Sequence, residues 1–360
     1  MKHQILILVL VTLVNHTFGQ RFVLPENDKN VVCEIVNGKI NRIQSIDFPI
    51  TKQLRLWENK AFCLDTANNK ILIADLFQSD INEKITKVQI PHDIKPISIS
   101  VFKDNIFVGG GYEKEKIYSY SQTLNKWTKL DIPAELAMFG KSVDDFMFTG
   151  DTLIAVDNIV MPKYLLYYDI QDLNNIKLIK SYTVPPNGTY ETLFRGLIFE
   201  EYFVILSSTF GGSGSQSYLT VLKRHDLPTL IDYEAKQGDY EYKGFSISNG
   251  LKNFWHLRLR PNIYPNRHWL DIVEKDGKIL IAESPNRIAT LKIKEKYFKP
   301  RRIVGFWYND EDYRQIIDKR KLNSKRIGNK DIKWFVKIPD TELIFLIYID
   351  KEKKYQFKQI

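Results

Sequence analysis

Residues 150–185 of the 360-residue chain read GDTLIAVDNIVMPKYLLYYDIQDLNNIKLIKSYTVP, and this stretch decides the fold. It holds three short runs rich in Leu, Ile, Val and Tyr, namely Leu153 to Val156, Tyr164 to Ile170 and Lys177 to Val184. Polar clusters typical of turns separate the runs, as expected of strands that follow one another through short connections. The stretch therefore predicts most of one four-stranded unit.

Proline closes a strand-like run at regular intervals along the chain. Pro49, Pro91, Pro133 and Pro185 are 42, 42 and 52 residues apart, and Pro228 follows after 43 more. A blade of a β-propeller has this length. Because proline lacks a backbone donor, it is suited to the end of an edge strand, which is the outermost strand of a blade. The spacing predicts a β-propeller.

A second series supports the same repeat. Six apolar segments turn through a short polar link into another apolar segment, which predicts six hairpins and at least six blades. They are Ala61 to Ala74, Ile97 to Gly109, Asp145 to Val156, Gly196 to Leu206, Trp269 to Ala282 and Trp334 to Ile349.

The two ends of the chain are expected to close the ring. Val31 to Phe48 resembles the outer two strands of a blade, and Trp334 to Ile349 resembles inner strands without outer partners. Sharing one blade would remove the free edges of an open sheet. The prediction is an all-β fold, a β-propeller of six or seven four-stranded blades, closed by the N- and C-terminal strands.

Two segments interrupt the repeat. Between Pro228 and Trp269 the repeat spacing breaks, and a degenerate seventh blade is slightly favoured over an insertion. Residues 309–333 are polar and predict a short helix and a loop. No Gly/Ser-rich linker divides the chain, so residues 20–360 are expected to form a single domain.

The N-terminus differs from the rest. Residues 1–19 combine a short basic start, an apolar run of about ten residues and small residues near Gly19, as in a secretory signal peptide. The alternative is a membrane anchor, for which the run is about half the required length. No later run is long enough to span a bilayer, so we expect a secreted or periplasmic protein.

The chain has two cysteines, Cys33 and Cys63. In an oxidising compartment they could form a disulfide, and the equal alternative is two buried free thiols. Neither has a histidine or a second cysteine at the spacing of a zinc site.

The repeat is similar to two known ones. Tyr164 to Tyr182 resembles the LVIVD repeat of exported bacterial β-propellers, with a strand ending in Asp169-Ile170, a polar turn and a further strand. Ile117 to Leu130 is similar to the end of a kelch repeat, whose paired glycines appear here only as Gly109 to Gly111. Both repeats are structural signatures, so the resemblance implies the fold and no catalytic residues.

One candidate binding segment is rich in aromatic and basic residues and lies where the repeat spacing breaks. Guanidinium and imidazole groups bind anions, and indole and phenol rings stack on sugars or cations. The alternative is an ordinary strand with alternating buried and exposed side chains. The candidate ligand-binding residues are Trp255, His256, Arg258, Arg260, Tyr264, Arg267, His268 and Trp269.

A basic patch is the second candidate. Residues 292–337 contain fifteen Lys and Arg against six Asp and Glu, an excess equal to the whole formal net charge of +9. This charge predicts a protein partner or an anionic polysaccharide, and no nucleic-acid motif is present. The alternative is a solvent-exposed basic surface that contributes to solubility and binds no partner. The patch comprises Arg301, Arg302, Lys319, Arg320, Lys321, Lys325 and Arg326.

No nucleophile and base are arranged as in a known catalytic motif, which favours a non-catalytic binding or interaction module that needs no cofactor. The enzyme question stays open, because propeller enzymes assemble their sites from distant residues. The alternative function is a calcium-dependent hydrolase or lactonase with its site in the central channel, where Asp145 and Asp157 could be metal ligands.

Overall fold

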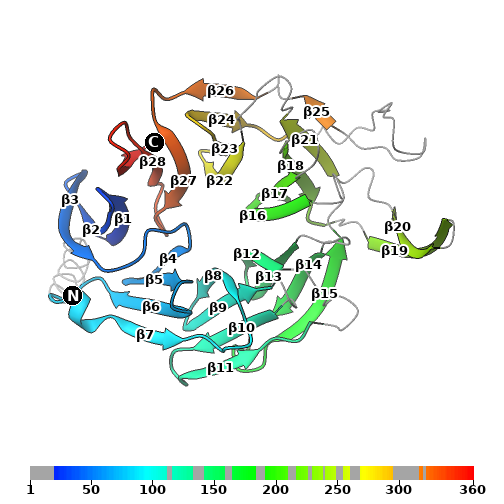
Figure 1. The fold of residues 1–360 in the computed structure, drawn as a ribbon, viewed down its shortest axis with the longest axis horizontal. Coiled ribbons are helices and arrows are strands. Elements are labelled where there is room, and N and C mark those ends of the chain that lie inside the picture. Colours follow the sequence, from blue (N-terminus) through cyan, green and yellow to red (C-terminus); the bar gives the residue numbers. More distant parts are fainter. Residues whose placement is uncertain are drawn as a thin grey trace, which may run out of the picture.

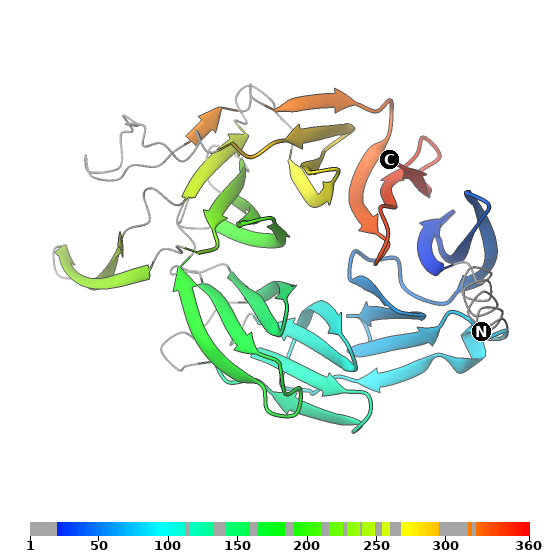
Figure 2. The ribbon, with the colours of Figure 1, turned by 180° about the vertical axis from the view of Figure 1, so that it is seen from behind.

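The computed structural model describes residues 20–111, 116–132, 142–158, 164–183, 191–209, 216–225, 229–237, 240–248, 254–259, 268–294, 316–318 and 322–360. Seven small sheets follow one another around a central axis and form a seven-bladed β-propeller (Figure 1 and Figure 2). Within each blade the strands run in chain order, from the innermost to the outermost. The predicted fold class is confirmed.

The first and last blades have three strands each. Blade 1 contains β1 (Arg21–Glu26), β2 (Lys29–Val36) and β3 (Lys39–Ile46). Blade 7 contains β27 (Asp331–Lys337), β28 (Ile344–Ile349) and β29 (Tyr355–Gln359).

The middle blades are larger. Blade 2 contains β4 (Leu54–Trp57), β5 (Lys60–Asp65), β6 (Lys70–Asp75) and β7 (Thr86–Gln89), with the 3-10 turn η1 (Asn82–Lys84) before β7. Blade 3 contains β8 (Pro96–Phe102), β9 (Asn105–Gly110), β10 (Lys116–Ser121) and β11 (Lys126–Lys129). Blade 4 contains β12 (Ser142–Thr149), β13 (Thr152–Asn158), β14 (Tyr164–Asp169) and β15 (Lys177–Thr183). Blade 5 contains β16 (Glu191–Phe199), β17 (Tyr202–Thr209), β18 (Gln216–Lys223), β21 (Phe254–Leu259) and the short parallel strand β25 (Ile316–Asp318). Blade 6 contains β22 (Trp269–Lys275), β23 (Lys278–Glu283), β24 (Arg287–Leu291) and β26 (Asn323–Arg326).

The stretch that predicted the repeat is the outer three-quarters of blade 4. Its three apolar runs are β13, β14 and β15, as expected. Gly150 takes a positive φ of 55° in the turn between β12 and β13, a conformation that glycine adopts without steric cost. The prolines follow the outermost strands, since β3 and β7 end at Ile46 and Gln89, shortly before Pro49 and Pro91.

All six predicted hairpins are present, and the seventh blade lies elsewhere than predicted. The described strands between Pro228 and Trp269 do not form the predicted degenerate seventh blade. Strands β19 (Thr229–Gln237) and β20 (Tyr240–Ser248) form a separate two-stranded hairpin, and β21 then returns to pair with β18. The prediction failed because β21 completes blade 5 after an insertion. The N-terminal strands provide the remaining blade.

Residues 309–333 also differ from expectation. The described part of this segment forms β25, β26 and the start of β27, with a short loop at 327–330 before β27, and no helix occurs among these described residues. Strand β26 pairs with β24, and this pairing supplies the outer strand of blade 6.

The two termini close the ring, as predicted, but as two neighbouring blades rather than one shared blade. Phe22 of β1 stacks on Phe345 of β28 with ring centroids 5.4 Å apart. The Asn27 amide donates to the Tyr355 carbonyl over 2.8 Å, and the Gln356 side chain donates to Asn27 Oδ1 over 2.9 Å. The closure therefore combines an apolar contact with hydrogen bonds at the strand ends.

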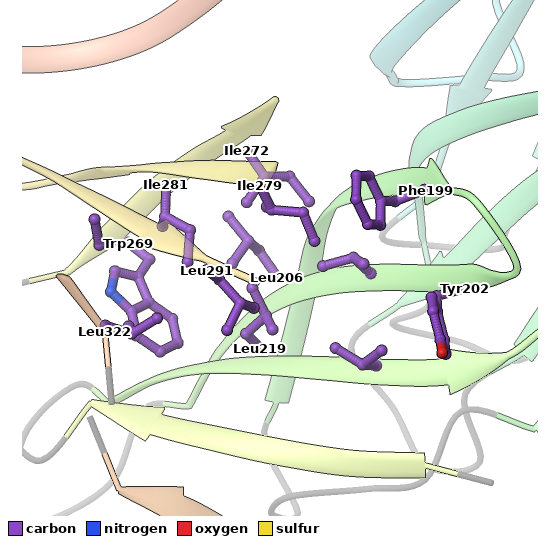
Figure 3. Close-up of a cluster of buried hydrophobic side chains, with 13 residues drawn as sticks. Phe199, Tyr202, Leu206, Leu219, Trp269, Ile272, Ile279, Ile281, Leu291 and Leu322 are labelled. Carbon is purple, nitrogen blue, oxygen red and sulfur yellow. The ribbon is translucent and has the colours of Figure 1, made fainter. Parts of the chain in front are cut away.

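The core is divided among the interfaces between blades. Figure 3 shows the interface of blades 5 and 6, where Leu206 and Leu219 face Ile279, Ile281 and the buried indole of Trp269. Burial of such side chains is the main favourable contribution to folding, at roughly 1.5–3 kcal/mol for each large apolar residue. A blade cannot bury both faces alone, so the ring is the stable unit.

Candidate functional site

Five side chains at one equivalent position surround the central channel. Each lies four residues before the last residue of an innermost strand, in blades 2 to 6. In blades 3 to 6 a register shift of the inner strand immediately precedes this position. We call these five residues the inner ring: Gln53, Ser98, Asp145, Arg195 and Asp271.

Every member of the inner ring binds the next blade. Three members accept hydrogen bonds from backbone amides: Gln53 from Ile99 over 3.2 Å, Asp145 from Gly196 over 2.8 Å, and Asp271 from Phe335 over 2.9 Å. Ser98 donates to the Val143 carbonyl over 2.5 Å, and Arg195 Nε forms an ion pair with Asp271 Oδ1 over 2.9 Å. The channel wall therefore links blades 2 to 7 in series.

Arg195 joins the two carboxylates of the inner ring. Its Nη1 lies 3.5 Å from Asp145 Oδ1, in addition to the contact with Asp271. Both carboxylates are almost fully buried, whereas 32% of the Arg195 side chain is exposed to the channel. Burial alone would lower the pKa of Arg195, but Asp271 and Asp145 together raise it above its ordinary value. The guanidinium therefore stays charged.

Arg55 of blade 2 also points into the channel. Its Nη2 lies 3.9 Å from Asp145 Oδ1, at the limit of an ion pair. Burial, and then repulsion by Arg195, lower the pKa of Arg55 to about 10 against the attraction of Asp145 and Asp271. Arg55 is thus less well compensated than Arg195. With Gln53, Asp145, Arg195 and Asp271 of the inner ring it lines a cavity of about 250 Å³.

The two residues predicted as calcium ligands lie in different environments. Asp145 is in the channel wall, as expected, but its oxygens are engaged by Arg195 and the Gly196 amide. Asp157 is buried on β13 opposite Val143 and is not among the residues that line the channel cavity. Within the described residues, no three His, Cys, Asp or Glu side chains form a group that could hold a metal ion.

A basic hollow lies on blade 6. It has a volume of about 520 Å³ and is open to solvent. Four lysines from or next to β22, β23 and β24 face one aspartate, with three uncharged residues completing the wall. The lysines are Lys275, Lys278, Lys292 and Lys294, and the remaining wall is Asp276, Leu280, Thr290 and Asn323. Such a concentration of ammonium groups attracts anions.

The predicted basic patch is partly placed by the structure. Lys325 and Arg326 are exposed on β26, the strand that starts at Asn323 in the wall of the hollow. The other predicted members lie outside the described residues, namely Arg301, Arg302, Lys319, Arg320 and Lys321. The described part of the patch therefore borders the hollow.

The aromatic segment is only partly described. Trp255, His256 and Arg258 lie on β21, where they pair with Val221, Thr220 and Tyr218 of β18. Arg260, Tyr264 and Arg267 lie outside the described residues. His268 is half-buried beside β22, and Trp269 is buried in the core between blades 5 and 6.

Both cysteines are buried free thiols, the second of the two alternatives. Cys33 is on β2 and Cys63 is on β5, in neighbouring blades. Burial is the largest cause that raises the pKa of each thiol to about 12. Neither is therefore a reactive thiolate near neutral pH.

Sequence reasoning missed most of the channel and part of the hollow. Arg55, Arg195, Asp271, Lys275 and Lys278 belonged to no motif. The available signal was positional, because all five inner-ring residues are polar or charged at one fixed distance from the end of an apolar inner strand. Only alignment of the blades on their first hairpin would have exposed it.

The comparisons with known proteins give no relative by sequence. No protein family and no curated protein matches the chain. Solved structures similar to it include the computationally designed Ika8 protein, at 9% identity and a TM-score of 0.48, covering 96% of this chain and 97% of that one. Another is Hsv2 of Kluyveromyces lactis, at 12% identity and a TM-score of 0.49, covering 95% and 94%. In the described residues we find no helix of the length and apolarity that a membrane span requires.

Proposed function

We propose that the protein is a non-catalytic binding module that takes an anionic glycan on the basic hollow of blade 6. The observation that carries this proposal is the hollow itself, where four lysines face a single aspartate. Ammonium groups spread around an open surface suit a ligand with repeated charges, such as a sulfated or uronic-acid polysaccharide. Lys325 and Arg326 on β26 extend the positive surface beyond the hollow.

A glycan is favoured over a protein partner by the chemistry of this face. The core of a protein interface is usually rich in aromatic and other apolar side chains. The large apolar side chains that are exposed in the described chain are Val36, Ile43, Leu124 and Ile179, and these belong to blades 1, 3 and 4. The hollow has one apolar wall residue, Leu280. Export through residues 1–19, which lie outside the described residues, is part of the proposal because it would bring the chain to such glycans.

The channel supports the non-catalytic part of the proposal. Asp145 and Asp271 already accept backbone hydrogen bonds and ion pairs, so each has a structural task. The calcium-dependent hydrolase remains the second candidate, and no specific contact favours it.

Binding to heparin immobilised on a sensor surface tests the proposed function. We expect saturable binding that weakens steeply as sodium chloride rises from 50 to 500 mM, because salt screens contacts between exposed charges. Binding that is independent of salt, or no binding at 50 mM salt, would refute it. Hydrolysis of esters or lactones that requires calcium would instead support the second candidate.

A further inference from the structure

In the central cavity, the positive charge of Arg55 is only partly compensated by the surrounding carboxylates. Arg55 is held in place by the start of β4 and the residues just before it, where Nη1 donates to the carbonyls of Lys52 over 2.8 Å and Leu54 over 3.1 Å. Its Nη2 donates to Gln53 Oε1 over 3.1 Å. All of these acceptors are uncharged. Among the described residues, the carboxylate that Arg55 contacts is that of Asp145, at 3.9 Å from Nη2.

The two inner-ring carboxylates are already compensated. Asp145 contacts Arg195 and the Gly196 amide, and Asp271 contacts Arg195 and accepts from the amides of Ile272 and Phe335. Lys337, a further cation of the cavity wall, forms an ion pair with Glu274 over 2.9 Å. Arg55 is therefore the guanidinium whose charge is least matched, and the cavity wall also contains Lys52 and Asp144.

The fixed guanidinium of Arg55 and the small cavity suit one class of ligand, a compact anion. We propose that the central cavity binds a small oxyanion group, a carboxylate or a phosphate, between Arg55 and Arg195. The side chain of Arg55 is 20% exposed and that of Arg195 is 32% exposed, and both line the cavity. The contacts of Arg55 within the described residues use Nη1 and Nη2, and those of Arg195 use Nη1 and Nε. We assign Nε of Arg55 and Nη2 of Arg195 as the donors to the oxyanion. A planar guanidinium binds two oxygens of such a group at once.

Size restricts the ligand further. A cavity of about 250 Å³ lies below the roughly 300–1,000 Å³ of pockets that hold drug-sized molecules. The ligand is therefore a small metabolite or a single terminal group, and not the polymer proposed for blade 6. The cavity is separate from the basic hollow, so the two proposals do not depend on one another.

Titration calorimetry with sodium phosphate and, separately, sodium acetate tests this site at constant ionic strength set with chloride. The wild-type chain is expected to bind at least one of the two with a stoichiometry near one. Phosphate binding alone assigns the site to phosphoryl compounds, and acetate binding alone assigns it to carboxylates. If neither anion binds, the proposal fails.

Variants identify the contact. Arg55→Met removes the guanidinium and keeps much of the side-chain length, and it should weaken binding about tenfold or more, as loss of a charge-assisted hydrogen bond does. Arg55→Lys keeps the positive charge but lacks the planar guanidinium, so it should give an intermediate affinity. It replaces Arg55→Met in the test if that variant fails to fold. Lys337→Met, a matched loss of charge at the same cavity, should change the affinity less than threefold. Equal affinity in wild type and both Arg55 variants would overturn the proposal.

Discussion

Asp145 accepts a hydrogen bond from the backbone amide of Gly196 over 2.8 Å, and this bond joins the inner strand of blade 4 to that of blade 5. The same carboxylate contacts Arg195, which reaches on to Asp271 of blade 6. A residue that could be taken for a metal ligand is thus part of a series of contacts between successive blades.

Asp145→Ala should lower the free energy of unfolding by about 3–5 kcal/mol, because it leaves the part-buried Gly196 amide and the Arg195 guanidinium without their partner. Urea unfolding measures the change. Asp151→Ala is the matched control, since Asp151 is 57% exposed and pairs with Lys103 over 3.7 Å, and its effect should stay below about 1 kcal/mol. Similar losses in the two variants would contradict the role of the inner ring.

Gly109→Ala should destabilise the protein by about 1–3 kcal/mol through overpacking. A Cβ atom at Gly109 would lie 2.5 Å from both Ser98 Oγ and the Val143 carbonyl oxygen. These two atoms form the link between blades 3 and 4, so neither can move without loss of that hydrogen bond. Thermal unfolding of the variant tests this, and an unchanged melting temperature would show that the blades can separate at no cost.

Calcium should leave the melting temperature unchanged when EDTA is replaced by millimolar calcium chloride. A bound ion would have to displace Arg195 from Asp145, and the two proposed ligands are not neighbours in the cavity wall. A ligand that binds only the native state must raise its stability. A rise of several degrees would therefore contradict this expectation and favour the hydrolase alternative.

Alkaline pH should destabilise the fold through the two thiols. Each thiol holds its proton more tightly when folded, because burial raises the pKa of Cys33 and Cys63 from 9.0 to about 12. Their contribution is fully present below pH 9 and is lost as the pH rises toward 12, at about 1.4 kcal/mol per thiol and pH unit. Urea unfolding between pH 8 and 11 measures the slope.

Cys33→Val should make that slope shallower than in the wild type, since one of the two titrating groups is removed. In the native protein neither thiol should react with a thiol reagent at pH 8, and both should react in denaturant. A disulfide in the mass spectrum of the native chain would contradict this account of the cysteines.

The repeat could be predicted from the sequence because its signals are local. Proline at Pro49 and Pro91 marks the outer strands, and the hairpin from Asp145 to Val156 is continuous in the chain. The number of blades could not be predicted, because this required knowing that β21 pairs with β18 after the β19–β20 insertion. No local sequence pattern indicates such a pairing. The local signals therefore predicted the blade unit but not the role of the insertion.

The candidate sites were harder to predict from the sequence, because their residues also come from distant parts of the chain. Asp145 could be placed near the axis, but its partner Arg195 lies 50 residues away, and the contact of Arg55 comes from across the channel. The basic hollow combines Lys292 and Lys294, which the charge count included, with Lys275 and Lys278, which reach it through the pairing of β22 with β23. Charge along the chain thus indicated the surface but not its shape.

Heparin affinity of two triple variants tests the central claim most directly. Lys278→Ala, Lys292→Ala and Lys294→Ala together remove three charges from the hollow of blade 6, whereas Lys87→Ala, Lys126→Ala and Lys129→Ala remove three exposed charges from blades 2 and 3. The account predicts that the first variant loses at least tenfold in affinity at 150 mM salt and that the second stays within threefold of the wild type. Equal losses in both would show that only the overall charge matters, and would contradict a binding site on blade 6.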